Sequence, residues 1–210
     1  MKKLIICLLA FLLTFSGCSS PKDNSGKIKI VATIFPAYDF ARAVAGDCAE
    51  VSMLLKPGTE IHSFEPTAED IIVVSEADIF IYTGGDGDAW VEKLLDSIDT
   101  ESKTIIKMTD HSELLYQEHS HEEEHHVCGA DEHVWLSPDN AKSIIAAVCA
   151  ALCKLDAKNA EGYNARAGEY SKGITRLAEE TKQVVAAADT NVLVVADRFP
   201  LRYFCHYFSL

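Results

Sequence analysis

The chain has 210 residues, of which 48% are hydrophobic, and its 32 acidic side chains outnumber 19 Lys and Arg to give a formal net charge of −13 at pH 7. This balance argues against a nucleic-acid-binding protein, because such proteins need a basic surface to meet phosphate groups. It suits a protein that attracts cations, although a solvated acidic surface would have the same composition.

The chain begins with the pattern of a bacterial lipoprotein signal. Two lysines precede an apolar run over residues 4–15, which is too short to cross a membrane comfortably, and small residues then lead to Cys18. We expect residues 1–17 to be removed and Cys18 to carry lipid, so that the mature chain is anchored outside the cytoplasmic membrane. Residues 18–27 would form a polar tether. An ordinary secretory cleavage site beside an incidental cysteine is the alternative.

From residue 28 onward, apolar runs alternate with helical patterns. The β-branched run at 28–34 is typical of a buried strand, and Pro36 and Gly46 mark the start and end of the helix that follows it. Further strands are predicted at 50–55, 78–82 and 104–108, and further helices at 88–98 and 138–155. Strands separated by helices predict an α/β fold with a parallel sheet, and we assign residues 28–155 to one such lobe.

The region after this lobe has a different pattern. Apolar residues recur every three or four positions from Ala160 to Val184, which predicts one amphipathic helix of about 30 residues and roughly 45 Å. We interpret residues 156–189 as a rigid connection between two lobes; a coiled coil is the alternative. A buried strand at 191–196 and a short aromatic-rich helix at 200–208 would then begin a second α/β lobe over residues 190–210.

Two histidines lie in turn-rich segments that follow predicted strands. His62 lies between Pro57 and Pro66 after the second strand, and His133 lies after the fourth strand, just before the helix that Ser137 caps. The carboxyl ends of parallel strands meet at one edge of a sheet, so we expect the two imidazoles to lie together there. Two imidazoles are most of a transition-metal site, whereas a lone histidine would more simply satisfy a turn by hydrogen bonding.

Carboxylates close to these histidines could orient them. Glu65 follows His62 and Asp131 precedes His133, and each could accept the hydrogen bond that fixes an imidazole tautomer. Because the neutral imidazole is the ligand, metal binding should weaken as the pH falls from about 7 to 5.

The loop at residues 111–130, between the two segments, contains many more potential ligands. These are His119, His121, Glu122, Glu123, Glu124, His125, His126 and Cys128. Histidine-rich tracts of this kind bind zinc or copper, and incidental histidines in an acidic, solvated loop are the alternative. Together with the two imidazoles, the loop favours Zn(II) over Mn(II), which prefers oxygen ligands.

The cysteines give no complete set of pairs. If Cys7 leaves with the signal and Cys18 carries lipid, five remain, so at least one is free, binds metal or lacks its partner. Cys149 and Cys153 are four residues apart in a predicted helix and share one face, where a disulfide would be geometrically awkward. We interpret this pair as small, buried apolar side chains.

The segments 57–67 and 132–141 resemble the two metal-ligand motifs of the zinc- and manganese-binding solute-binding proteins of ABC importers, and the resemblance extends over residues 28–210. It implies two α/β lobes joined by one long rigid helix, with the ion in the cleft between them. It also implies His62 and His133 as ligands. Zinc-specific members of that family have a histidine-rich loop at the position of residues 111–130.

Two features depart from this family pattern. The third family ligand falls on Arg198, which cannot bind a cation, so we expect its neighbour Asp197 to take that role; a capping or turn residue is the alternative for Asp197. Members of the family also continue well beyond this point, so the second lobe is expected to be incomplete.

The leading functional hypothesis is therefore a receptor without enzymatic activity, which captures Zn(II) outside the membrane and delivers it to an ABC permease and its ATPase. A manganese or iron receptor of the same type, and a metal-binding adhesin or buffer, are alternatives. A zinc hydrolase is less well supported, because the sequence has no His-Glu-x-x-His motif, no nucleophile elbow and no Cys-x-x-Cys pair.

Overall fold

A four-stranded parallel sheet lies at the centre of the computed structural model, which describes residues 26–59, 61–116, 129–196 and 199–210. The strands are β1 (Ile28–Ala32), β2 (Ala49–Met53), β3 (Ile79–Tyr82) and β4 (Thr104–Lys107), in the spatial order β2-β1-β3-β4. Every neighbouring pair is parallel. The predicted α/β fold with a parallel sheet is confirmed.

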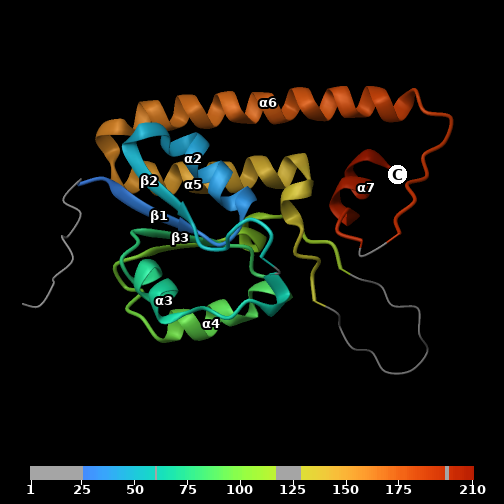
Figure 1. Cartoon of the computed structure of the whole chain (residues 1–210). Coiled ribbons are helices and arrows are strands. Elements are labelled where there is room, and N and C mark those ends of the chain that lie inside the picture. The colour runs from blue at the N-terminus through green and yellow to red at the C-terminus, as the bar shows by residue number, and fades with distance from the viewer. Residues whose placement is uncertain (1–25, 60, 117–128, 197–198) are drawn as a thin grey trace, which may run out of the picture.

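Helices cover both faces of the sheet, as Figure 1 shows. On one face lie α2 (Phe35–Ala45), α5 (Pro138–Leu155) and α6 (Ala160–Ala186), and on the other lie α3 (Ala68–Ser75) and α4 (Ala89–Asp96). Alternating strand side chains serve the two faces: Ile30 and Ala32 join the core with α2 and α5, while Val31 joins the smaller core with α3 and α4. None of the helices in the described part of the chain combines the length and apolar character that a membrane crossing requires.

Helix α3 is absent from the sequence-based prediction. Thr67 caps it: the Thr67 hydroxyl accepts a hydrogen bond from Asp70 N at 3.2 Å, and the Asp70 carboxylate accepts one from Thr67 N at 2.8 Å. This reciprocal capping box has a local sequence signature, so the helix was predictable. Short 3-10 turns complete the described structure at Gly46–Cys48, Ile61–Ser63, Asp86–Asp88, Met108–His111, Val134–Leu136 and Ala157–Asn159.

Helix α6 is tied to the sheet by its first half. Tyr163 is fully buried, and the Arg166 guanidinium donates to the carbonyl oxygens of Val44 and Ala45 at the end of α2. The second half extends beyond the sheet (Figure 1), where Leu177 is 64% and Val184 is 71% exposed. The predicted long amphipathic helix is therefore present, with its apolar face covered over only part of its length.

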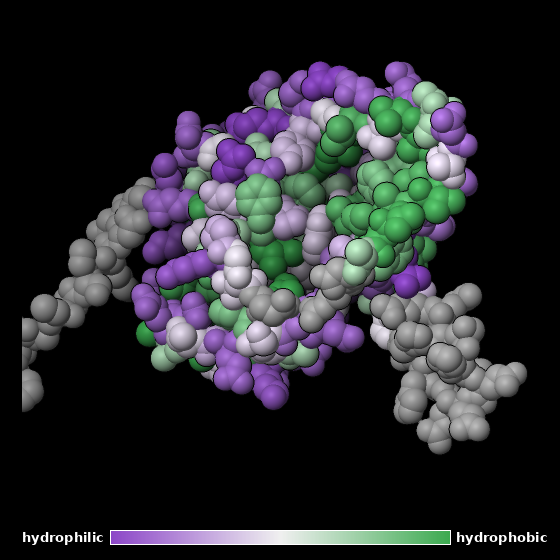
Figure 2. Space-filling model, turned by 45° about the vertical axis from the view of Figure 1, so that its right-hand side comes forward, coloured by the Kyte–Doolittle hydropathy of each residue, from purple (hydrophilic) through white to green (hydrophobic). Residues whose placement is uncertain are grey.

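The predicted buried strand at 191–196 is wrong. These residues adopt no regular structure, and Val194 is 88% exposed. The valine-rich run has high strand propensity, but propensity alone does not bury a strand, and no strand lies beside it in the described residues. Exposed apolar side chains gather on this side of the molecule, as Figure 2 shows.

The last helix, α7 (Arg202–Phe208), matches the predicted short aromatic helix. Its Tyr203 is 2% exposed and belongs to the core that includes α2 and α5. Helix α7 thus packs against the segment that contains His133.

Candidate metal centre

His62 lies in the connection from β2 to α3. A turn closed by Thr59 N donating to Lys56 O includes Gly58 at φ 86°, a conformation that favours glycine. The 3-10 turn Ile61–Ser63 follows, and Phe64 packs edge-on against Trp90 of α4 with ring centroids 5.0 Å apart. The His62 side chain is 41% exposed, and its Nε2 lies 3.6 Å from Glu132 Oε1.

His133 lies in the connection from β4 to α5. The 3-10 turn Val134–Leu136 leads directly to Ser137, whose hydroxyl accepts from Asn140 N at 3.4 Å and caps α5, with Pro138 as the first helical residue. His133 N and Nδ1 lie 2.9 and 3.0 Å from Asp131 Oδ1. If Nδ1 carries the proton that it donates to Asp131, then Nε2 keeps a free lone pair for a metal ion.

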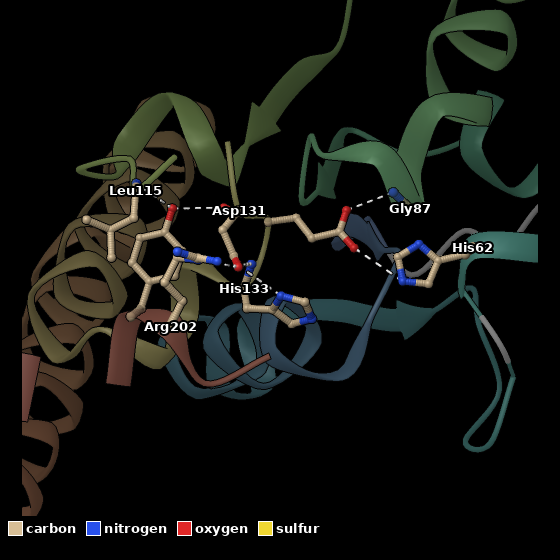
Figure 3. Close-up of polar contacts among 8 residues, drawn as sticks. His62, Gly87, Leu115, Asp131, His133 and Arg202 are labelled. Carbon is tan, nitrogen blue, oxygen red and sulfur yellow. Dashed lines mark hydrogen bonds and ion pairs between the residues drawn. The ribbon is translucent and has the colours of Figure 1, made fainter. Parts of the chain in front are cut away.

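Asp131 is held in turn by helix α7 (Figure 3). The Tyr203 hydroxyl donates to Asp131 O at 2.8 Å and accepts from Leu115 N at 3.1 Å, while Arg202 Nε lies 3.4 Å from Asp131 Oδ2 as an ion pair without hydrogen-bond geometry. Burial would raise the pKa of the Asp131 carboxyl, but the hydrogen bonds from His133 and the charges of His133 and Arg202 outweigh it, so this pKa lies below its usual range. Asp131 is therefore a buried carboxylate kept in its ionised form.

Glu132 is a site residue that the sequence analysis missed. It is 8% exposed, and its Oε2 accepts a hydrogen bond from Gly87 N at 2.7 Å, while Oε1 faces His62. The loop after β3 leaves room for it only because that loop is glycine-rich: a Cβ at Gly85 would lie 2.3 Å from the Glu132 Cβ. A carboxylate directly before His133 in the sequence is the signal that could have identified it.

The two histidines line one pocket of about 230 Å³, together with Asp86, Asp131 and Glu132. An adjoining pocket of about 390 Å³ also includes His133 and Glu132, but its remaining walls are mostly apolar, with Phe35 and Trp135 among them. The expectation that both imidazoles lie at the same sheet edge agrees with this placement. The carboxylate that faces His62 is Glu132 rather than the expected Glu65. The expected orienting partner of His133, Asp131, is in place.

The pocket brings potential ligands together without closing them around an ion. Within residues 26–59, 61–116, 129–196 and 199–210, no three His, Cys, Asp or Glu side chains are close enough to hold a metal. The other predicted site residues lie outside the described residues: Cys18, His119, His121, His125, His126 and Asp197. Two imidazoles and a buried carboxylate are nevertheless a donor set that suits zinc.

Comparison with known proteins gives consistent matches. The family model described as "ZnuA: Zinc-uptake complex component A periplasmic" matches residues 30–210. The zinc-binding lipoprotein AdcA of Streptococcus pneumoniae serotype 4 is 39% identical over 152 residues, which cover 69% of this chain and 30% of that protein. The zinc-binding protein AdcA of Streptococcus pyogenes serotype M3 is 32% identical over 206 residues, covering 89% of this chain and 39% of that protein.

The fold of this chain also matches solved structures. The crystal structure of Zn(II)-bound AdcA from Streptococcus pneumoniae superposes with a TM-score of 0.76 at 30% identity, over 88% of this chain and 38% of that one. This chain therefore spans between 30% and 39% of the length of these relatives.

Proposed function

Since this chain belongs to the ZnuA family of periplasmic zinc-uptake components, we propose that it forms the Zn(II)-capturing part of an extracytoplasmic receptor. The observation that supports this most directly is one pocket lined by His62, His133 and the buried carboxylate of Glu132. In this proposal the two imidazole nitrogens bind the ion, and Glu132 supplies negative charge beside it.

The residues of the pocket supply only part of a zinc coordination shell. Imidazole nitrogen and carboxylate oxygen bind zinc at about 2.0–2.2 Å, and a tetrahedral shell needs one or two further donors. We propose Asp197 as one of these, and the histidines at 119, 121, 125 and 126 as an auxiliary zinc-binding tract. The names of the zinc-binding relatives favour Zn(II) over Mn(II) for this chain as well.

The wider assembly follows from the same proposal. Residues 28–155 would form the metal-binding lobe, 156–189 the connecting helix and 190–210 the start of a second lobe. Lipid on Cys18 would hold the receptor at the membrane, where it would pass zinc to an ABC permease driven by its ATPase. Delivery requires reversible binding, and a lobe that moves against its neighbour is one way to achieve it.

The test is isothermal titration calorimetry of Zn(II) with a competing chelator, on the full chain. His62→Ala and His133→Ala should each lower the affinity of the tightest site by more than the roughly 10–100-fold typical of losing an outer partner. Glu132→Gln should cost about 10-fold, since it keeps an acceptor for Gly87 N and loses the charge. His206→Ala is the matched control, because His206 is an exposed imidazole on α7, away from the pocket.

Deleting residues 119–126 separates the pocket from the histidine-rich tract. The tight site should survive this deletion, and only weaker binding should be lost. If the tight site disappears with the tract and is insensitive to His62→Ala and His133→Ala, the pocket is not the site of capture. Zinc-dependent hydrolysis of generic ester or phosphoester substrates would instead favour a hydrolase.

A further inference from the structure

A pair of cysteine side chains lies away from the pocket, between helices α5 and α6. These helices run side by side on one face of the sheet (Figure 1). A groove of about 430 Å³ separates part of their surfaces, and Cys149, Cys153 and Asn164 line it. The groove is lined by several small residues, and there is free space beside its α6 wall: a Cβ added at Gly168 would meet no atom within 4 Å.

The two cysteine thiols are placed as a pair by the helix itself. Cys149 and Cys153 are one turn apart on α5, so their side chains share a face, and their Sγ atoms lie 4.0 Å apart. Two sulfur ligands of one tetrahedral zinc ion, each at about 2.3 Å, lie about 3.8 Å apart. A disulfide needs a separation of about 2.05 Å, so closing that bond would require a much larger movement.

Polar groups of α6 converge on the same thiols. Asn164 Oδ1 lies 3.7 Å from Cys149 Sγ, and Asn164 Nδ2 lies 3.5 Å from Cys153 Sγ. The carbonyl oxygen of Ala160 lies 3.8 Å from Cys153 Sγ. Two sulfur atoms and an amide oxygen therefore meet at the groove, while the Ala160 oxygen accepts a hydrogen bond from Asn164 Nδ2 at 2.8 Å.

We propose that Cys149 and Cys153 form a second metal site, which binds a thiophilic ion such as Zn(II) or Cd(II) as a two-thiolate chelate, with the Asn164 side-chain oxygen or water completing the shell. One divalent ion replaces two thiol protons, which pass to solvent, and no electrons are transferred. Thiolates prefer Cu(I), Zn(II) and related soft ions over Mg(II), Ca(II) and Mn(II), which defines the class of ligand.

The state of the thiols sets how the site responds to pH. Burial and the neighbouring Cys153 thiol raise the pKa of Cys149 to about 11. Metal binding replaces thiol protons, and the affinity should therefore rise as the pH increases. Simple apolar packing is the competing interpretation, but Cys153 is only partly buried and faces the groove.

The test uses Cd(II) as the probe, added under reducing, oxygen-free conditions to the full chain. Thiolate-to-Cd(II) charge-transfer absorption reports sulfur ligation, and mass spectrometry of alkylated peptides reports which cysteines the ion protects. We expect protection of Cys149 and Cys153 together, and loss of their share of the absorption in both Cys149→Ser and Cys153→Ser, because one sulfur alone cannot chelate. Cys205→Ser, a buried cysteine on α7, is the matched control and should change neither readout.

The outcomes separate this site from the zinc pocket. The double variant His62→Ala/His133→Ala should keep the protection of Cys149 and Cys153 unchanged, whatever happens to the capture of Zn(II). Alkylation of both cysteines at the same rate with and without Cd(II), measured on the unaltered chain, would overturn the proposal even if the serine variants fold poorly. A Cys149–Cys153 disulfide in the purified chain that resists reduction would overturn it as well.

Discussion

His133 and His62 reach the same pocket from segments that the fold holds to different degrees. The His133 side chain is 28% exposed, its segment lies between Asp131 and the cap of α5, and helix α7 holds Asp131 from behind. The His62 side chain is 41% exposed, lies on a single 3-10 turn and faces Glu132 at 3.6 Å, which is longer than a good hydrogen bond. The His133 imidazole is oriented by Asp131, while the His62 imidazole is more exposed and lies on a short turn.

Substitutions on the two sides of the pocket should therefore have different consequences. Changes behind His133 disturb an imidazole whose orientation is part of the folded state, so they should affect both zinc affinity and stability. Changes around His62 act on a more exposed turn, so in the proposed site they should affect affinity with less effect on stability. Because Asp131 already orients the His133 imidazole, binding in the proposed site would cost little conformational entropy at His133.

Among changes that leave the proposed metal ligands intact, Asp131→Asn should have the greatest effect. The substitution removes the charge that orients His133 and faces Arg202, so zinc affinity should fall roughly 10–100-fold. Calorimetry with a competing chelator measures the affinity, and Asp189→Asn, at an exposed position after α6, is the matched control. Equal affinity in Asp131→Asn and the control would mean that His133 does not depend on the Asp131 carboxylate for its orientation.

Gly85→Ala tests the His62 side without altering any ligand. Gly85 has a φ of −114°, which alanine adopts freely, but its Cβ would lie 2.3 Å from the Glu132 Cβ and must displace that side chain. We expect about 10-fold weaker zinc binding, with an overpacking cost of about 1–3 kcal/mol in the free energy of unfolding. Gly173→Ala is the matched control, because a Cβ there meets no atom within 4 Å. Unchanged zinc affinity would remove Glu132 from the proposed site.

Local sequence patterns predicted the sheet, the cap of α5 and the placement of both histidines after parallel strands. Each of these depends on residues close in sequence, or on a general rule about parallel sheets. The role of Glu132 was not predictable in the same way, since it arises where Gly87, 45 residues earlier in the chain, comes beside it. The missed helix α3 differs, because Thr67 and Asp70 carry its capping signal in the sequence.

The role of α7 was also hidden from sequence reasoning. Its aromatic residues predicted a helix, but the contact between Tyr203 and Asp131 joins positions 72 residues apart. The exposed run at 191–196 shows the opposite error, because β-branched residues indicate a strand whether or not a neighbouring strand exists to pair with it. Both the contact of α7 with Asp131 and the absence of a strand at 191–196 depend on tertiary neighbours, which the periodicity of the sequence does not encode.

Tyr203→Phe should weaken the His133 side from behind. The hydroxyl links Leu115 N to Asp131 O in a buried position, so its loss leaves a donor and an acceptor without this partner. The free energy of unfolding should fall by about 1–3 kcal/mol in chemical denaturation, and zinc affinity should fall only a few-fold. Tyr116→Phe, at a 58% exposed tyrosine, provides the control and should leave both unchanged. A loss of zinc affinity as large as that of Asp131→Asn would mean that α7, not Asp131, fixes the imidazole.

Phe64→Ala should loosen the His62 side in a complementary way. Phe64 packs edge-on against Trp90, and this aromatic pair holds the turn that carries His62 on the surface of α4. Losing the aromatic pair should lower the free energy of unfolding by about 0.5–1.5 kcal/mol, in addition to the cost of losing the buried apolar area of the ring. Hydrogen exchange should then increase in residues 61–64 and remain unchanged in residues 131–137. Equal increases in both segments would show that the two sides of the site unfold as one unit.

The smallest expected effect is a pH dependence of the metal-free protein. The pKa of Asp131 is lower in the folded state than in the unfolded chain, so its ionised form stabilises the fold at pH values above the usual aspartate pKa of about 4. That contribution is lost as the pH falls through the folded-state pKa, when the carboxyl takes up a proton. Denaturation at a series of pH values should therefore show wild type and Asp131→Asn converging in stability below about pH 4, with a constant difference above it. A stability difference that persists unchanged at lower pH would mean that Asp131 stabilises the fold by packing rather than by its charge. The His133 segment would then differ from the His62 segment in packing and not in electrostatics.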